Sequence, residues 1–228
     1  MVATDIARNW LEVRGAVPSS VEVIAVSKTK PMEAVEAAYS AGARSFGENR
    51  VQELVGKHEA LTAAEGGRSG EFEGLVWHQI GTLQKNKVKY IAPFVGLIHA
   101  VDQEGLLAEV DKRAAACGRR VPVLLQVHIA QESSKFGLSE AELAALLDRL
   151  DAGAFAHVEV KGLMGMATFT SDEGQVAREF GGLRTLFDRF GPERHWDTLS
   201  MGMSGDWRIA VAEGSTMVRI GSSIFGSR

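Results

Sequence analysis

Short apolar runs alternate with longer helix-patterned segments along the whole chain, and this alternation limits the fold more than any other feature. Eight runs have the length of buried strands. Strands separated by helices are typical of a parallel sheet, because parallel strands need a long crossover connection. At 228 residues without a break in composition, we expect one α/β domain over residues 1–228, a single (β/α)8 TIM-type barrel, with an open doubly wound sheet as the alternative. The expected strands are 21–28, 43–47, 76–81, 97–102, 122–129, 157–166, 198–202 and 217–221.

The segments between these strands carry the i, i+3, i+4 apolar spacing of amphipathic helices, as the leucines of residues 143–150 show. Ser139 with Glu142 is a capping-box start for that helix. A leading amphipathic segment with Ile6 and Trp10 predicts an extra N-terminal helix. The other expected helices are 32–41, 48–60, 84–90, 104–117, 139–150, 173–190 and 205–213.

Charge and cysteine usage exclude several classes of protein. The formal net charge is −4, so no basic field indicates a nucleic-acid partner. No apolar stretch approaches the ~20 residues that span a bilayer, and residues 1–8 lack the apolar core of a signal peptide. Cys117 is the single cysteine, and the histidines lack His-x-x-x-His spacing, so we expect no metal site. We expect a cytoplasmic protein without a nucleic-acid or membrane partner.

Lys28 closes the first apolar run, where burial of an ammonium group is costly. Desolvation favours the neutral amine, which is the form that attacks an aldehyde. A lysine at the end of a strand is therefore a natural Schiff-base former, and pyridoxal 5'-phosphate (PLP) is the commonest aldehyde cofactor held in this way. The alternative is a strand-end lysine that only reaches solvent.

The loops after the last two expected strands carry groups that could hold a phosphate. Barrels tend to bind phosphate there, through backbone N–H groups and a helix N-terminus. Gly221 would let the backbone approach an anion, and Ser204 and Ser222 add hydroxyl donors. Turn and cap chemistry is the alternative for each loop alone. Their occurrence together in the two loops that share the expected site favours a phosphate.

Arg219 lies two residues before Gly221, so strand alternation points both toward one face. A guanidinium deeper in the barrel mouth could donate to a pyridine nitrogen and leave that nitrogen unprotonated. This would weaken the cofactor as an electron sink. A core arginine paired with a carboxylate is the alternative.

Five blocks of the sequence, spread over nearly the whole chain, resemble the pyridoxal phosphate homeostasis proteins, single-domain relatives of the alanine racemase N-terminal barrel. The sequence departs from the family pattern at Gln79, Thr82 and His128, which leaves the wall of the pocket less defined. The blocks are AVSKTKP at 25–31, FGENRVQE at 46–53, WHQIGTLQKNK at 77–87, LSMGMS at 199–204 and GSTMVRIG at 214–221.

The resemblance implies a role for each residue of a cofactor site. Lys28 would carry PLP as a Schiff base and Arg219 would face the pyridine nitrogen. The phosphate would be held by Ser204, Gly221 and Ser222. The residues expected to line the pocket are Asn49, His78 and Ser200.

The resemblance also implies a PLP-binding protein of vitamin B6 and amino-acid homeostasis that stores, buffers or delivers the cofactor without dedicated catalysis. The alternative is a PLP-dependent amino-acid racemase, which needs a second base. The racemases take a tyrosine from a separate domain for which residues after 221 leave no room, and Tyr39 and Tyr90 fall in expected helices. An aldolase-type enzyme using Lys28 and Glu48 is a third possibility. We expect a monomer, with apo PLP enzymes as candidate recipients.

Overall fold

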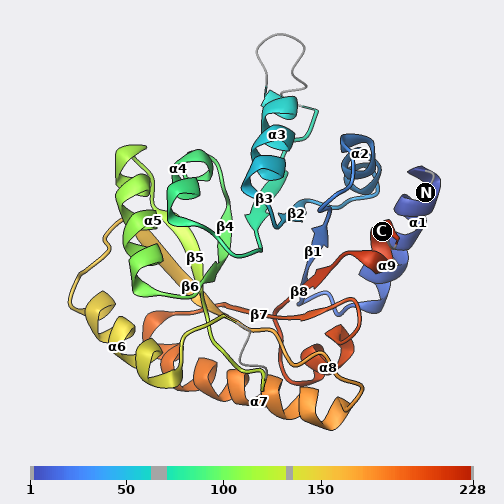
Figure 1. The fold of residues 1–228 in the computed structure, drawn as a ribbon. Coiled ribbons are helices and arrows are strands. Elements are labelled where there is room, and N and C mark those ends of the chain that lie inside the picture. The colour runs from blue at the N-terminus through green and yellow to red at the C-terminus, as the bar shows by residue number, and fades with distance from the viewer. Residues whose placement is uncertain (1–2, 63–70, 132–135, 227–228) are drawn as a thin grey trace.

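Eight parallel strands form a closed barrel in the order β1 to β8, each beside its neighbour in sequence (Figure 1). The structure, a computed structural model, describes residues 3–62, 71–131 and 136–226. The barrel confirms the expected fold class, and the doubly wound alternative is wrong because β1 pairs with β8. The strands are β1 (Glu22–Val26), β2 (Ser45–Glu48), β3 (Val76–Gln79), β4 (Leu97–Val101), β5 (Val121–Gln126), β6 (Val158–Met164), β7 (Thr198–Met203) and β8 (Met217–Ile220).

Helices surround the barrel and follow the predicted segments closely. The capping box of α6 is present, with Ser139 accepting from the Glu142 N–H and the Glu142 carboxylate accepting from the Ser139 N–H. The described helices are α1 (Ala3–Ala16), α2 (Met32–Ser40), α3 (Val51–Thr62), α4 (Val88–Ile91), α5 (Glu104–Ala116), α6 (Glu140–Asp151), α7 (Glu173–Phe190), α8 (Trp207–Ala212) and α9 (Ser222–Phe225), with 3-10 turns at Lys85–Lys87 and Pro192–Arg194.

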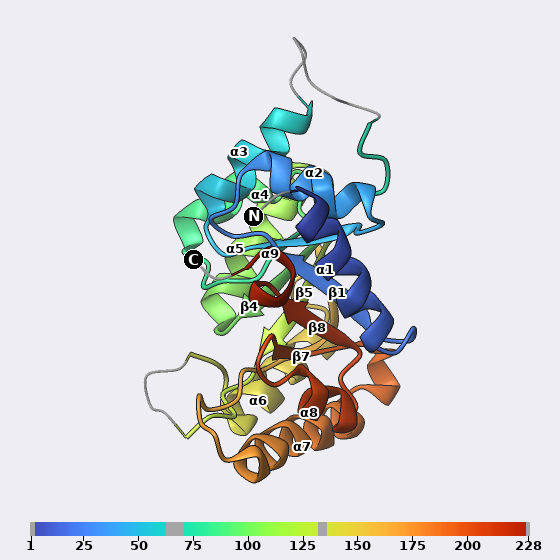
Figure 2. The same ribbon diagram turned by 90° about the vertical axis from the view of Figure 1, so that its right-hand side faces the viewer.

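The short helix α9 is absent from the sequence-based expectations because four residues are too few to show helical periodicity. It begins directly after Gly221 and packs against the predicted N-terminal helix α1, whose Asn9 Nδ2 donates to the Ile224 carbonyl at 3.1 Å. Figure 2 shows α1 and α9 side by side next to β1 and β8. The first and last helices of the described chain therefore pack together on one side of the barrel.

Each strand divides its side chains between two apolar layers. The outer layer, between strands and helices, takes residues such as Val23, Ala25 and Phe46. A smaller apolar cluster is made up of Ile24, Leu97, Ala100, Leu124, Met164 and Met217. Other buried positions carry polar side chains, among them His78, His99, Ser200 and Arg219, which belong to the site described below.

The segment 43–47, which has the weakest strand pattern, forms β2 over Ser45–Glu48 and pairs with β1 and β3. Gly47 explains the weak pattern, because a Cβ at this position would lie 2.9 Å from Ile24 Cγ2. A small residue is therefore required where the barrel interior is narrow.

No helix within the described ranges is long and apolar enough to cross a membrane.

Candidate functional site

Lys28 lies in a tight turn just beyond β1. The strand ends at Val26, two residues earlier than predicted, because the chain turns and the Lys30 N–H donates to the Ser27 carbonyl at 3.0 Å. Lys28 is half-buried, so it is not as enclosed as the apolar run suggested. Thr29 follows with φ 64°, a left-handed conformation that costs a non-glycine residue about 1 kcal/mol or more. The turn that carries Lys28 is held in a strained shape.

Arg219 lies in β8 opposite Ile24 of β1, four residues before Lys28, and so lies deeper in the barrel. Its Nη1 donates to Ser200 Oγ at 2.6 Å and to the Ser200 carbonyl at 2.9 Å, and its Nη2 donates to the Gly165 carbonyl at 3.2 Å. Among the described residues it has no ion pair with a carboxylate. Burial lowers the pKa of Arg219 to about 10, so the guanidinium stays protonated at neutral pH. These contacts are not those of a core arginine paired with a carboxylate.

The loops after β7 and β8 meet, as predicted. The Gly221 N–H donates to Ser204 Oγ at 3.1 Å. A Cβ on Gly221 would lie 3.2 Å from the Val26 carbonyl, so the backbone of this loop packs closely against the end of β1. Ser222 is exposed at the start of α9. Backbone and hydroxyl groups from the two loops thus border the end of the strand that leads to Lys28.

A chain of polar contacts crosses the barrel interior from Arg219 to His78. Ser200 Oγ, which accepts from Arg219, lies 3.2 Å from His99 Nδ1, and His99 Nε2 lies 3.0 Å from His78 Nδ1. Arginine only donates, so a consistent direction for these contacts runs from Arg219 to Ser200, from the Ser200 hydroxyl to His99 and from His99 to His78. With this choice of tautomers, His78 Nε2 carries a proton; this nitrogen is buried and has no partner within the described residues.

Burial holds both histidines neutral. Desolvation lowers the pKa of His78 to about 4, and the pKa of His99 lies well below its usual value through burial and the nearby charge of Arg219. His99 was not among the expected site residues. The signal for it was a histidine in the apolar run of β4, but only the barrel register shows that it joins Ser200 to His78.

The carboxyl ends of β2 and β3 carry further buried polar atoms. Asn49 Oδ1 and Gln79 Oε1 have no hydrogen-bond partner within the described ranges. The amide nitrogen of Gln79 donates to the carbonyls of Gly81 and Asn49 at 3.1 and 3.3 Å. Buried polar atoms in native proteins are nearly always hydrogen-bonded. Their concentration on the side of the barrel that also carries His78 indicates a place for a polar ligand or water.

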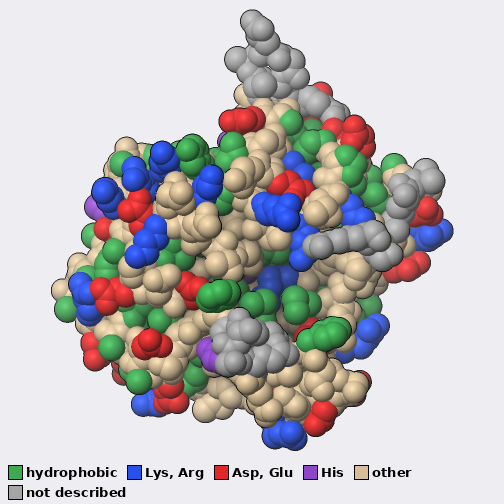
Figure 3. All heavy atoms as spheres, viewed as in Figure 1, with side chains coloured by type: hydrophobic (Ala, Val, Ile, Leu, Met, Phe, Trp, Pro, Cys, Tyr) green, Lys and Arg blue, Asp and Glu red, His purple; other side chains and the backbone are tan. Residues whose placement is uncertain are grey.

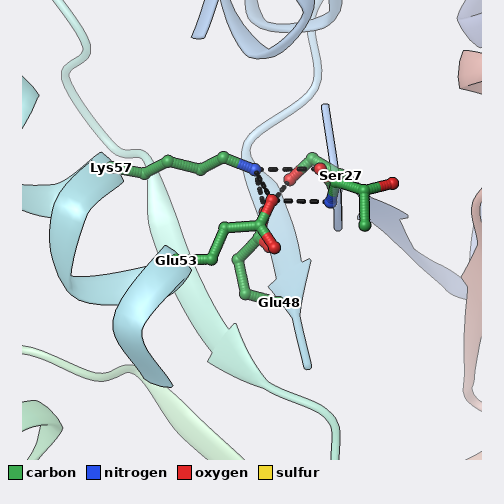
Figure 4. A network of polar contacts seen from close by, with 5 residues as sticks. Ser27, Glu48, Glu53 and Lys57 are labelled. Atoms are coloured by element: carbon green, nitrogen blue, oxygen red, sulfur yellow. Dashed lines mark hydrogen bonds and ion pairs between the residues drawn. The ribbon is translucent and has the colours of Figure 1, made fainter. Parts of the chain in front are cut away.

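Glu48 at the end of β2 is fully buried and forms a second polar cluster. Its Oε1 accepts from Ser27 Oγ at 2.5 Å and from Lys57 Nζ at 2.6 Å (Figure 4). Burial raises the pKa of Glu48 to about 7, even though the Lys57 charge and hydrogen bonds oppose the shift. This contact with Lys57 of α3 was not predicted. It engages Glu48 Oε1, while Oε2 is buried and has no hydrogen-bond partner within the described ranges.

Figure 3 shows a hollow in one face of the molecule, with Lys or Arg side chains at its floor and hydrophobic side chains on its rim. Three exposed large apolar residues are Phe136, in the connection between β5 and α6, Phe169, in the connection between β6 and α7, and Met203, at the end of β7. Within the described ranges, no group of three His, Cys, Asp or Glu side chains is arranged to hold a metal ion.

Comparison with known proteins agrees with this architecture. The family model for the alanine racemase N-terminal domain matches residues 3–228. The pyridoxal phosphate homeostasis protein of Vibrio alginolyticus is 40% identical over 218 residues, covering 94% of this chain and 89% of its own. The protein of the same name from Escherichia coli strain K12 is 38% identical over 238 residues, with 98% and 97% covered.

Solved structures show the same relationship. PipY of Synechococcus elongatus PCC7942, solved with PLP bound, is 36% identical with a TM-score of 0.85, covering 97% of this chain and all of its own. An alanine racemase from Streptomyces lavendulae has a TM-score of 0.80 but 17% identity, covering 99% of this chain and 58% of the racemase, which shows the shared fold alone.

The fold and the matched family model define a barrel protein of the alanine racemase N-terminal class. Within this class, the chain is 36–40% identical, over nearly its whole length, to the two homeostasis proteins and to PipY. The chain belongs to the family of pyridoxal phosphate homeostasis proteins, as its sequence blocks predicted.

Proposed function

We propose that this chain binds PLP at the mouth of the barrel, holds it as a Schiff base on Lys28, and stores, buffers or delivers it in vitamin B6 and amino-acid homeostasis. The observation that carries the proposal is the set of chemically matched groups around the ends of β7, β8 and β1. An amine on Lys28, a buried cation on Arg219 and the joined loops of Ser204 and Gly221 follow one another along three adjacent strands.

The residues present fit this cofactor. Its phosphate needs N–H and hydroxyl donors, and Gly221, Ser222 and Ser204 carry such groups where the two loops meet, at the hydrogen bond from the Gly221 N–H to Ser204 Oγ. The ring nitrogen needs a donor, for which Arg219 is suited. Asn49 Oδ1 and His78 Nε2, which are buried and have no partner within the described ranges, would form hydrogen bonds with polar substituents of the ring or with water.

When bound, PLP supplies an aldehyde whose carbon forms a C=N bond with Lys28 Nζ as water is lost. The chain's own residues set the conditions for this linkage. Arg219 keeps its protons, because its pKa of about 10 lies far above neutral pH, and therefore donates a hydrogen bond without transferring a proton. Its position against Ser200 and Gly165 holds it rigidly beneath the mouth.

A role without dedicated turnover is favoured over racemisation by the placement of the tyrosines. Racemisation requires bases on both faces of the substrate carbon. The sequence has two tyrosines. Tyr39 Oη, on α2, donates to the Glu73 carbonyl at 2.9 Å, and Tyr90 is 49% exposed on α4. Neither is at the carboxyl end of a strand, and the buried His78 lacks the pKa of a base that works near neutral pH.

The absorbance spectrum between ~300 and 500 nm, with and without added PLP, tests the proposal. We expect a band near ~420 nm that is absent in Lys28→Ala. Wild-type protein that stays colourless with PLP would contradict the proposal and favour an aldolase-type enzyme. Rapid interconversion of L- and D-amino acids by the yellow protein would instead establish the racemase alternative.

Delivery is a further part of the proposal, with apo PLP enzymes as recipients and the chain acting as a monomer in the cytoplasm. Half-burial of Lys28 supports exchange, because an accessible linkage can react with incoming amines. Transfer to an apo-enzyme faster than release into solution would support delivery, whereas equal rates would leave buffering alone. Sedimentation equilibrium tests the monomer.

A further inference from the structure

A buried cluster of charged side chains holds the backbone on both sides of Lys28. Lys57 of α3 donates to three acceptors: Glu48 Oε1 at 2.6 Å, the Ser27 carbonyl at 2.9 Å and Glu53 Oε1 at 2.9 Å. Glu53 Oε1 also accepts from the Thr29 N–H at 2.6 Å. The residues before and after Lys28 are thus tied, through hydrogen bonds, to one ammonium group (Figure 4).

The cluster is too enclosed and too costly to be an ordinary surface ion pair. The side chains of Lys57 and Glu48 are 8% and 0% exposed, and that of Glu53 is 21% exposed. Taking such charges out of water costs several kcal/mol for each ion, and an apolar pair of similar volume often stabilises a fold as well or better. A contribution to the stability of the fold therefore does not explain the cluster well. A role in holding the backbone around Lys28 in one conformation explains it better.

The part of the chain that the cluster constrains is the turn at residues 27–29. Thr29 adopts φ 64°, which a threonine avoids in a free turn. The hydrogen bond from the Thr29 N–H to Glu53 and the bond from Lys57 to the Ser27 carbonyl oppose relaxation of this turn. The backbone of Lys28 lies between these two anchored residues, so its side chain leaves the backbone in a direction set by the cluster.

We propose that Lys57, held between Glu48 and Glu53, is a positioning residue that fixes the turn around Lys28 and orients its amine for attack on the aldehyde of PLP. This inference rests on the proposed function and deepens it. Lys57 itself does not touch the cofactor. It acts through the backbone of residues 27–29. Its loss would slow the formation of the C=N bond between Lys28 and PLP while the barrel stays folded.

The test compares Lys57→Met with Arg113→Met. Arg113 forms a matched i, i+4 ion pair with Glu109 on α5, at 2.6 Å, outside the cluster. After PLP is added to the apo-protein, we expect the ~420 nm band of Lys57→Met to form about tenfold more slowly or worse, and that of Arg113→Met to form at the wild-type rate. Equal rates in folded Lys57→Met and wild type, or equal slowing in both variants, would overturn the proposal.

Hydrogen exchange in the PLP-free protein gives a readout that does not depend on the cofactor. We expect the Thr29 amide to exchange faster in Lys57→Met and Glu53→Ala, and to be protected again in Glu53→Gln, which keeps a carbonyl acceptor. Unchanged protection in Lys57→Met would contradict the inference. If wild type forms no band at all, the proposed function fails, while exchange at Thr29 still decides whether Lys57 holds the turn.

Loss of one buried charge could unfold Lys57→Met. The double variant Glu48→Gln/Lys57→Met removes both charges and still lacks the bond to the Ser27 carbonyl. Slow band formation in this folded variant supports the proposal, and a wild-type rate overturns it.

Discussion

Arg219 Nη1 and Ser200 Oγ lie 2.6 Å apart, which joins β8 to β7 inside the barrel and begins a polar chain that ends at His78. A guanidinium held by a hydroxyl and two backbone carbonyls keeps its direction without a carboxylate partner in the described ranges. Ser200, expected only to line the pocket, thereby connects Arg219 with the histidines. Its contacts support a role in orienting Arg219 in addition to any contact with the cofactor.

Ser200→Ala should lower the free energy of unfolding by about 1–3 kcal/mol, since Arg219 and His99 would each lose a buried partner. Denaturant titration measures this loss. Ser45→Ala, which removes an exposed hydrogen bond to Glu22, should cost less than about 1 kcal/mol and serves as the control. Equal costs for the two variants would contradict the importance of the buried chain.

Gly221→Ala should weaken PLP binding by about tenfold, which corresponds to about 1.4 kcal/mol. The added methyl group would lie 3.2 Å from the Val26 carbonyl and would shift the loop that carries the Gly221 N–H. Equilibrium titration of the absorbance band measures the affinity. Gly182→Ala on α7, where a Cβ meets nothing within 4 Å, is the matched control and should bind PLP as the wild type does. Wild-type affinity in Gly221→Ala would argue against a phosphate at this loop.

Glu48 should make the protein less stable as the pH rises from about 4.5 to about 7. Its pKa is raised from 4.5 to about 7 on folding, so the folded state retains a proton that the unfolded state has lost in this window. The contribution is fully present below pH 4.5 and is lost as the pH passes 7, with a size of up to about 3 kcal/mol. Glu48→Gln should abolish this part of the slope. A constant difference between the two stability curves would contradict the raised pKa.

His78 should act in the opposite direction. Its pKa falls from 6.5 to about 4 on folding, so the unfolded state takes up a proton first as the pH falls. Stability should therefore be lost between pH 6.5 and 4, and His78→Asn should reduce this acid sensitivity by up to about 3 kcal/mol. Unfolding free energies measured at intervals across this range would show the change. An unaltered acid limb in the variant would show that His78 is not buried in its neutral form.

The sequence by itself determined the architecture and the main elements of the site. Alternating strand and helix patterns predicted the barrel, because each pattern is a local consequence of which face is buried. Lys28 and the loops with Ser204 and Gly221 were identifiable because, in such a barrel, the carboxyl ends of the strands all face the same mouth. Their roles toward PLP stay predictions until the spectra are measured.

Only the tertiary structure decided which polar side chains meet. His99 joins Ser200 to His78, and Lys57 reaches Glu48 and Ser27, through the register of neighbouring strands and the seating of α3 on them. Periodicity within one segment indicates which face a residue occupies, but not how far that segment slides along its neighbour. A hydrogen bond tolerates a few tenths of an ångström, so these partnerships depend on positions that closure of the whole barrel sets.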